Sequence, residues 1–261
     1  MNKTWVFGDY AQAEPRIVAW AGPVPQLKAW FKEGKDVHTE VLRQISRVVQ
    51  TGNIVLPNRL FARKPWQDYG KEDTERNLAK NTVNGNNYGL GKRKFGLITG
   101  LPERYAEILQ RIYFRLFPEV RTGYQAWIKS QLPIITMPQG WPIQFYGRPD
   151  EEMERKAFSL YAQSTVGLLI TKTLCDVCEH HPDAKGIWTP QRIAAGGYPV
   201  QLQIHDAIGV PVADDPLAIR EAVETISHYA SQELIIKGEA LVLPMDFRVG
   251  HSWGDLKPYV G

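Results

Sequence analysis

The sequence predicts an α+β fold, in which an antiparallel sheet is combined with a larger number of helices. An apolar run at residues 4–9 ends at Asp9 and has the length of a short strand. Two alternating runs, at 200–204 and 208–212, flank the turn His205-Asp206-Ala207 as the strands of a hairpin would. Helical patterns lie between these strands without a strict β-α-β alternation, so a doubly wound parallel sheet fits less well.

The other elements follow from local signals. Asp36, and either Asp73 or Thr74, can cap helix N-termini, and acidic residues 150–152 suit the positive end of a helix dipole. We expect helices at 14–21, within 23–33, and at 36–49, 73–88, 102–132 (broken around Phe117-Pro118), 150–180 and 216–236. We also expect a loop at 51–72, a turn into a strand at 138–142 and a last strand at 242–248.

Composition indicates an ordinary globular protein. The 261 residues are 43% hydrophobic and 23% charged, and no apolar run approaches the roughly 20 residues of a membrane span. The first residues lack the apolar stretch of a secretory signal, and two cysteines are too few for a disulfide framework. We therefore expect a protein of the reducing cytoplasm with no membrane partner.

Positive charge is concentrated in one part of the chain. The net charge is only +3, but the segment from Arg59 to Lys94 holds nine basic and four acidic residues, which is a local excess of five. Such a stretch suits a polyanion such as nucleic acid or a triphosphate. On charge alone, a solvated helix face is the simpler interpretation.

Three short segments combine polar side chains in a way that a catalytic site could use. Residues 9–16, DYAQAEPR, begin with an acid at a strand end and continue into a turn with a second acid and a base. Residues 203–207, QIHDA, place an acid at the tip of a hairpin. Arg76, Lys80, Asn84 and Tyr88 are spaced by four and form one stripe on a helix. The two cations of this stripe could hold a triphosphate, and its aromatic ring could pack on a base or sugar. Each segment alone is common in proteins, whereas their order and combination are specific.

These segments resemble the conserved motifs of family A DNA polymerases, the bacterial polymerase I and phage replicase type. Residues 9–16 resemble motif A, residues 76–89 motif B and residues 203–207 motif C. Further matches follow in the same order: Asp36-Val37-His38-Thr39, Gly147-Arg148, Arg155-x7-Gln163-Ser164-Thr165, and Gly250-x-Ser252-Trp253-Gly254. The resemblance covers nearly the whole chain. It implies a palm with an antiparallel sheet at residues 1–22 and 136–261, and mainly helical fingers at 23–135.

The resemblance also implies a two-metal nucleotidyl transferase. Asp9 and Asp206 would bridge two Mg²⁺ ions, for which Mn²⁺ can substitute, and the carbonyl of Tyr10 would be a further ligand. Arg76, Lys80 and His38 resemble the residues that contact a deoxynucleoside triphosphate, and Lys80 would protonate the leaving pyrophosphate. The remaining nucleotide-site residues implied by the resemblance are Gln12, Glu14, Asn84 and Tyr88, of which Glu14 resembles the steric gate against a ribose 2′-hydroxyl.

A second group of residues resembles those that contact primer-template DNA. This group comprises Arg16, Arg148, Arg155, Gln163 and His205, and Gln12 is either structural or also faces DNA. The alternative for such side chains is a salt bridge on a helix or a hydrogen bond in the core, and the sequence leaves both readings open.

The chain departs from the family pattern at several positions. Motif C ends in Ala207 where the family usually has Glu, Asn84 replaces an aromatic residue that packs on the sugar, and Ser159 replaces an Asn. Pro15 follows the gate residue, where it suits the first turn of a helix. Two acids are enough to hold the metals, so we expect activity to persist at a reduced level.

The chain begins about eight residues before motif A. The resemblance therefore predicts that the thumb and exonuclease of complete members are absent and that the chain alone binds DNA weakly. A split polymerase, with a second polypeptide that supplies the thumb, is the expectation, and a phage is its expected source. An excised piece and a degraded remnant are the other readings.

Two further alternatives remain open from the sequence. A polymerase-like subunit with weak catalysis, which binds DNA or scaffolds a replisome, would suit Ala207 and the missing thumb. RNA synthesis is disfavoured by Glu14, because the related RNA polymerases have a small residue there. The run Cys175-Asp-Val-Cys178-Glu-His180-His181 has spacings that could bind Zn²⁺, but buried thiols on a helix are the preferred interpretation.

Overall fold

The computed structural model describes residues 3–52, 74–180 and 200–261. The chain divides into two compact units, the first formed by Met1–Ala13 and Ser164–Gly261 and the second by Glu14–Gln163. The predicted α+β class is confirmed, because helices are combined with an antiparallel sheet. Most of the loop expected at 51–72, the candidate cap Asp73 and His181 lie outside the described residues.

The first unit is built on a five-stranded antiparallel sheet with the order β4-β5-β1-β8-β9. Its strands are β1 (Lys3–Tyr10), β4 (Leu202–Ile204), β5 (Ala207–Ala213), β8 (Met245–Gly250) and β9 (Lys257–Pro258). β1 is the central strand, and the first six residues of β5 are buried. The predicted hairpin is therefore present, with β4 and β5 as its strands.

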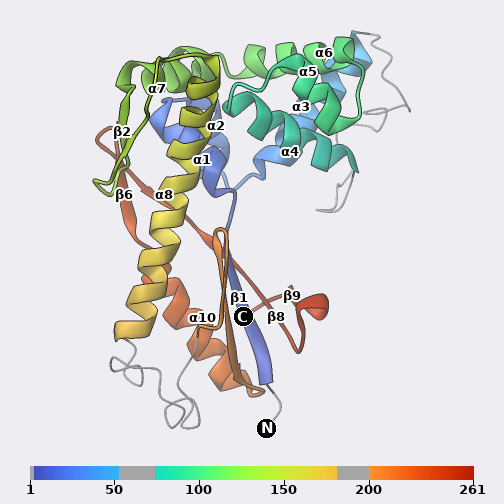
Figure 1. Cartoon of the computed structure of the whole chain (residues 1–261). Coiled ribbons are helices and arrows are strands. Elements are labelled where there is room, and N and C mark those ends of the chain that lie inside the picture. Colours follow the sequence, from blue (N-terminus) through green and yellow to red (C-terminus); the bar gives the residue numbers. More distant parts are fainter. Residues whose placement is uncertain (1–2, 53–73, 181–199) are drawn as a thin grey trace. The chain divides into compact units, whose positions relative to one another are not determined.

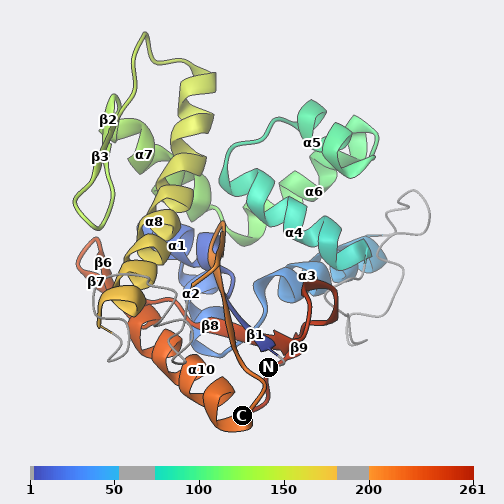
Figure 2. The ribbon, with the colours of Figure 1, turned by 60° about the horizontal axis from the view of Figure 1, so that its bottom comes forward.

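Helix α10 (Pro216–Ala230) contacts β1, β5 and β8 and lies along this sheet (Figure 2). Its start follows from the sequence, because the Asp215 side chain accepts a hydrogen bond from the Ala218 amide at 3.0 Å and Pro216 occupies the first turn. Ala222, Ile226 and Ala230 are spaced by four and form its buried face.

The end of α10 corrects one sequence expectation. A helix was expected to reach residue 236, but α10 ends at Ala230, and β6 (Glu233–Ile236) pairs with β7 (Glu239–Val242) in a separate two-stranded sheet. In β6, burial alternates with a period of two, which a strand satisfies and a helix does not. Lys237 and Gly238 both have positive φ, the geometry of a tight hairpin turn.

The second unit is mainly helical. Helices α3, α4, α5 and α6 pack on one another and gather in one group in Figure 1. The helices of this unit are α1 (Ala13–Ala21), α2 (Pro25–Lys32), α3 (Val37–Thr51), α4 (Thr74–Asn87), α5 (Lys92–Thr99), α6 (Glu103–Leu116), the π-helical segment Val120–Gln125, α7 (Ala126–Gln131) and the first part of α8 (Glu151–His180). A short hairpin joins β2 (Ile134–Thr136) to β3 (Pro142–Gln144). The expected break near Phe117-Pro118 is present, whereas α5 was not predicted.

The C-terminal end of α4 is held by buried polar side chains. The Tyr113 hydroxyl donates to Asn87 Oδ1 at 2.6 Å. The amide of Gln125 donates to the carbonyls of Asn86 and Asn87 at 2.8 and 3.1 Å, so carbonyl groups left unpaired at the helix end gain partners. These contacts fix the backbone directly before Tyr88, the last residue of the predicted stripe.

Candidate functional site

Asp9 lies near the end of the central strand of the sheet. In the strand register Asp9 is opposite Ala207 on β5 and opposite Asp246 on β8. Residues that face each other across antiparallel strands project on the same side, so the side chains of Asp9 and Asp246 share one face. The Asp9 side chain is 38% exposed, so its carboxylate is partly accessible to solvent.

Asp206 comes next to Asp9 through the turn between β4 and β5. Ile204 pairs with Ala207, so His205 and Asp206 form a two-residue turn, and His205 has φ of 52°, a value that favours glycine. The Tyr10 amide donates to the Asp206 carbonyl at 3.2 Å, which ties this turn to the end of β1. The structure therefore brings the two predicted metal-binding acids to adjacent strand ends.

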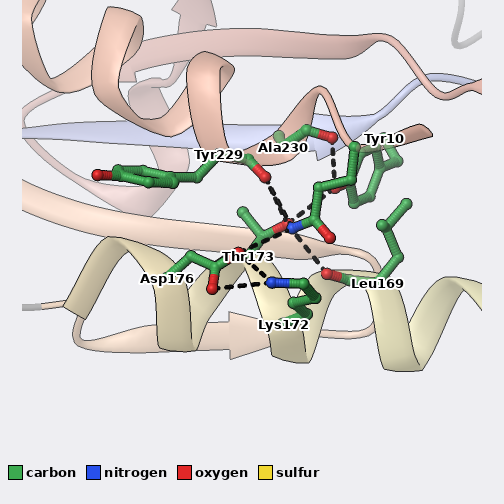
Figure 3. A network of polar contacts seen from close by, with 8 residues as sticks. Tyr10, Leu169, Lys172, Thr173, Asp176, Tyr229 and Ala230 are labelled. Atoms are coloured by element: carbon green, nitrogen blue, oxygen red, sulfur yellow. Dashed lines mark hydrogen bonds and ion pairs between the residues drawn. The ribbon is translucent and has the colours of Figure 1, made fainter. Parts of the chain in front are cut away.

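Tyr10, the residue after Asp9, is anchored by a buried phenol (Figure 3). Its oxygen lies 3.0 Å from the hydroxyl of Thr173 on α8 and donates to the carbonyl of Ala230 at 3.1 Å. Burial raises the pKa of Tyr10 to about 12, and the Thr173 hydroxyl partly opposes this rise. The phenol therefore stays protonated, and the backbone after Asp9 is fixed to two helices.

Arg248 on β8 was not recognised from the sequence. Its Nη2 lies 3.8 Å from Oδ2 of Asp9, and its guanidinium carbon lies 5.3 Å from the ring centroid of Phe7. Asp246 was also missed. Both residues are distant from Asp9 along the chain, and only the register of β1 with β8 reveals that they are neighbours.

The donor atoms at these strand ends suit a hard cation that completes its coordination with other oxygens. In the part of the chain that the structure describes, no group of three or more His, Cys, Asp or Glu side chains is arranged to hold a metal ion. Mg²⁺ is commonly bound by one or two carboxylates, with waters and substrate phosphates as its other ligands. The carboxylates of Asp9 and Asp206 and the Tyr10 carbonyl are ligand types that suit Mg²⁺ with waters or phosphates as its other ligands. They are too few for a closed structural metal site.

The second unit contains the basic part of the prediction. Arg76 lies on α4 and is only 8% exposed, and its Nη2 donates to Oδ2 of Asp36 at 2.7 Å. Lys80, one turn further along α4, is exposed. His38 is 5% exposed, and burial, opposed by Asp36 and assisted by Arg76 and Lys80, lowers its pKa to about 4. The imidazole is therefore neutral near pH 7.

Glu14 and Tyr88 also meet within the second unit. The Tyr88 hydroxyl donates to a carboxylate oxygen of Glu14. Burial, reinforced by the negative charge of Glu14, raises the pKa of Tyr88. The hydrogen bond holds the predicted gate residue against the predicted nucleotide-site ring. Asn84 is half-buried, and its Oδ1 has no hydrogen-bond partner among the described residues.

The other predicted site residues have varied surroundings. Arg16 stacks on Phe31, with its guanidinium carbon 4.3 Å from the ring centroid. Arg155 pairs with Glu151 at 3.2 Å on α8, which is the salt bridge that the sequence left open as an alternative. Gln12 has φ of 52°, so the turn after β1, like the turn at His205, contains a left-handed residue other than glycine. The exposed members of the set are Arg148, Gln163 and His205.

The expectation of buried thiols is wrong. Cys175 is exposed and Cys178 is half-buried, and neither is in a disulfide. They lie three residues apart on α8, close to one face of the helix, and that face is only partly covered. His180 is part of the same helix.

The first unit contains strand ends with two acids, and helix α4 of the second unit contains Arg76 and Lys80, with Tyr88 directly after its last residue. Over almost its whole length the chain is similar to the polymerase portion of family A DNA polymerases, which confirms the resemblance noted in the sequence. No family model matches the chain. No helix among the described residues is long and apolar enough to cross a membrane.

The individual matches are distant but extensive. The chain is 26% identical to the thermostable DNA polymerase I of Thermus filiformis over 95% of its own length and 27% of that protein. It is 23% identical to DNA polymerase I of Deinococcus radiodurans over 97% of its length and 24% of that protein. The chain thus spans about a quarter of the length of these curated relatives.

A solved structure has the same fold. The chain superposes on the POL domain of Pol1 from M. smegmatis, in complex with DNA primer-template and dNTP, with a TM-score of 0.71 at 19% sequence identity. The match covers 97% of this chain and 40% of that one. The polymerase-domain fold predicted from the sequence is therefore present.

Proposed function

We propose that this chain is the catalytic core of a DNA-directed DNA polymerase, which extends a primer with deoxynucleoside triphosphates. The observation that carries the proposal is the meeting of Asp9 and Asp206 at adjacent strand ends of one sheet. We further propose that the first unit corresponds to the palm and the second to the fingers. The units divide after Ala13 and after Gln163, whereas the predicted domains 1–22, 23–135 and 136–261 divide after residues 22 and 135. The similarity to DNA polymerase I supports both assignments.

In this proposal Asp9, Asp206 and the Tyr10 carbonyl hold two Mg²⁺ ions, or Mn²⁺ in their place. Such ions, when bound, activate the primer hydroxyl and neutralise charge on the triphosphate. Strand pairing fixes the backbone of Asp9, and the hydrogen bond from the Tyr10 amide holds the turn at Asp206. The buried phenol of Tyr10 anchors the residue next to Asp9, so the acids need little rearrangement. Positioning and charge neutralisation are the main contributions that a protein makes to phosphoryl transfer.

The second unit supplies the proposed triphosphate contacts. Arg76 and Lys80 offer charged donors, and neutral His38 can donate one N–H to a phosphate oxygen. Lys80 is exposed and would give a proton to the leaving pyrophosphate. Glu14, held by Tyr88, would occupy the space of a ribose 2′-hydroxyl, and the other residues proposed for the nucleotide site are Gln12 and Asn84.

The proposed contacts to primer-template DNA come from both units and use exposed or half-exposed side chains. In the second unit Arg148 and Gln163 are exposed, and the Arg155 side chain shares its charge with Glu151 before any DNA is bound. His205, at the turn beside Asp206, would touch the primer end. The full set proposed here is Arg16, Arg148, Arg155, Gln163 and His205. A second polypeptide that supplies a thumb, in a split enzyme of phage origin, stays a prediction.

One observation favours a second candidate function, a polymerase-like subunit that binds DNA with weak catalysis. Ala207 lies opposite Asp9, where the family usually has a carboxylate, and a cation, Arg248, lies beside Asp9 instead. Both features reduce the negative charge available to metal ions. This candidate predicts DNA binding without nucleotide incorporation, whether Mg²⁺ or Mn²⁺ is supplied.

Primer extension by the purified full chain, alone and with a thumb-bearing polymerase fragment, distinguishes the two candidates. We expect extension with deoxynucleotides, little with ribonucleotides, and a loss of roughly a thousandfold in Asp206→Ala, since a bound ion contributes several kcal/mol. Glu224→Ala, on the exposed face of α10, is the control. Extension that persists in Asp206→Ala would refute the proposed function.

A further inference from the structure

We propose that Asp36 is a positioning residue that holds Arg76 in the orientation in which it receives a triphosphate. The inference rests on the proposed function, because it assigns a role in that same nucleotide site. Asp36 sits just before α3 and was expected only to cap this helix. The contacts of its two carboxylate oxygens indicate that it also acts on the neighbouring helix α4.

The two oxygens of Asp36 have separate partners. Oδ1 accepts a hydrogen bond from the Thr39 amide at 2.7 Å, which is the helix cap. Oδ2 accepts a hydrogen bond from Nη2 of Arg76 at 2.7 Å. Because α3 and α4 pack against each other, the carboxylate links the start of one helix to the first turn of the other.

The Arg76 contact is more than a surface ion pair. The Arg76 side chain is 10% exposed and that of Asp36 is 32% exposed, so the pair is partly shielded from water. An arginine has five N–H donors in a rigid fork at the end of a long side chain, and part of its rotamer entropy is lost when the fork is fixed. Asp36 uses one nitrogen to fix the fork before any ligand arrives, and the donors on the other nitrogens remain for an anion.

Electrostatics within the cluster supports the same role. Burial alone would raise the pKa of Asp36, but the hydrogen bonds from Arg76 and Thr39 outweigh it, and the pKa is lowered. Asp36 is therefore ionised across the neutral pH range. Its charge offsets the repulsion between Arg76 and Lys80, which lie four residues apart on one helix face. Without Asp36, a nearly buried guanidinium would lose its charge partner and turn toward water.

His38 provides an independent sign that this cluster receives a ligand. Its ring is almost fully buried, and Nδ1 has no hydrogen-bond partner in the part of the chain that the structure describes. A buried polar atom without a partner is costly, and an incoming phosphate oxygen could satisfy the ring nitrogen in its N–H form. The same short segment thus contains the acid that orients Arg76 and a buried donor left without a partner.

The test separates capping from positioning. Asp36→Ser keeps a capping oxygen for the Thr39 amide but is too short to reach Arg76, and Asp36→Asn keeps one acceptor without the charge. Asp215→Ser is the matched control, because Asp215 caps α10 in the other unit and accepts from the Ala218 amide at 3.0 Å. Arg76→Ala reports the loss of the phosphate contact itself. Binding of dATP and of inorganic tripolyphosphate, each with Mg²⁺, is measured by calorimetry on the full chain of every variant.

We expect Asp36→Ser to weaken both ligands roughly tenfold, the effect of one charged hydrogen bond. Asp36→Asn should be intermediate, Asp215→Ser should bind as the wild type does, and in primer extension the KM for dATP should rise more than kcat falls. If Arg76→Ala weakens binding and Asp36→Ser leaves it unchanged, Asp36 is only a helix cap. If Asp36→Ser tightens binding, Asp36 competes with the ligand for Arg76. In both cases the inference is wrong while the proposed function stands. If neither ligand binds to the wild-type chain, both are refuted.

Discussion

The acidic strand ends and the basic helix face are held in place in different ways. Asp9 is held by strand pairing and Asp206 by the turn between β4 and β5 and a backbone hydrogen bond from Tyr10, and the side chains of both acids remain partly exposed. Arg76 and His38 are nearly buried, and Arg76 is held by the side chain of Asp36. The acidic site therefore depends on the fold for its geometry, whereas the basic site is itself part of the packing that stabilises the fold.

This difference predicts that activity and stability separate at the acidic site. Asp9 faces Asp246 across the sheet, and like charges in that arrangement destabilise a strand pair. Asp9→Asn should lower primer extension roughly a thousandfold, because the substitution removes a metal ligand and a bound metal contributes several kcal/mol. The same substitution removes the like-charge repulsion. Its midpoint of thermal unfolding without metal should be unchanged or higher than that of the wild type.

Thermal unfolding of Asp9→Asn and Arg76→Ala, measured side by side without metal, checks the comparison. Arg76→Ala removes the charged partner of the partly buried Asp36, so it should lower the unfolding midpoint. Equal destabilisation by the two substitutions would mean that the acidic site, too, is part of the stabilising core.

The basic site should also make stability depend on pH. The pKa of His38 is about 4 in the folded chain and near 6.5 in an unfolded one. Above 6.5 the ring is neutral in both states. Between 6.5 and 4 the unfolded chain binds the proton and the folded chain does not, so the unfolding free energy falls as the pH falls through this window.

Urea unfolding at pH 7.5 and pH 5.0 measures this loss. From the difference between the two pKa values we expect the wild type to lose about 2 kcal/mol more than His38→Asn over this interval. His228→Asn is the control, because His228 lies on the exposed side of α10. The same pH dependence in the wild type and His38→Asn would show that His38 is not the group responsible.

The sequence identifies the candidate residues of both sites more readily than it identifies their neighbours. Asp9, Asp206, Arg76 and Tyr88 occur in short motifs, whose spacing along the chain can be read directly. Asp246 and Arg248 are distant from Asp9 along the chain, and their proximity depends on a strand register that local patterns do not encode. Long-range pairing is the information that was missing.

The errors in secondary structure have a similar cause. The apolar residues of β6 follow α10 closely and also fit a helical pattern, so a longer helix was expected. Their partner strand β7 decides between the two readings, and the pairing of β6 with β7 is a tertiary contact. For Cys175, helical position was predicted correctly and burial was not, because burial depends on which helix face the rest of the unit covers.

The smallest predicted effect concerns Arg248, a cation beside Asp9. Its contact with Asp9, at 3.8 Å between half-exposed side chains, has the strength of a surface ion pair, at most about 1 kcal/mol. A metal ion that binds Asp9 must weaken this contact. Arg248→Gln should therefore tighten metal binding by up to about fivefold, the factor in affinity that corresponds to about 1 kcal/mol.

Electron paramagnetic resonance of Mn²⁺ bound to the full chain measures this change without requiring activity. Arg220→Gln, on an exposed position of α10, controls for the general loss of one positive charge. Because exposed charges are screened by salt, the difference between Arg248→Gln and the wild type should shrink as ionic strength rises. Weaker Mn²⁺ binding in Arg248→Gln would instead mean that Arg248 orders the Asp9 carboxylate for the metal. The acidic site would then, like the basic one, depend on a side-chain partner, and the contrast between the two sites would fail.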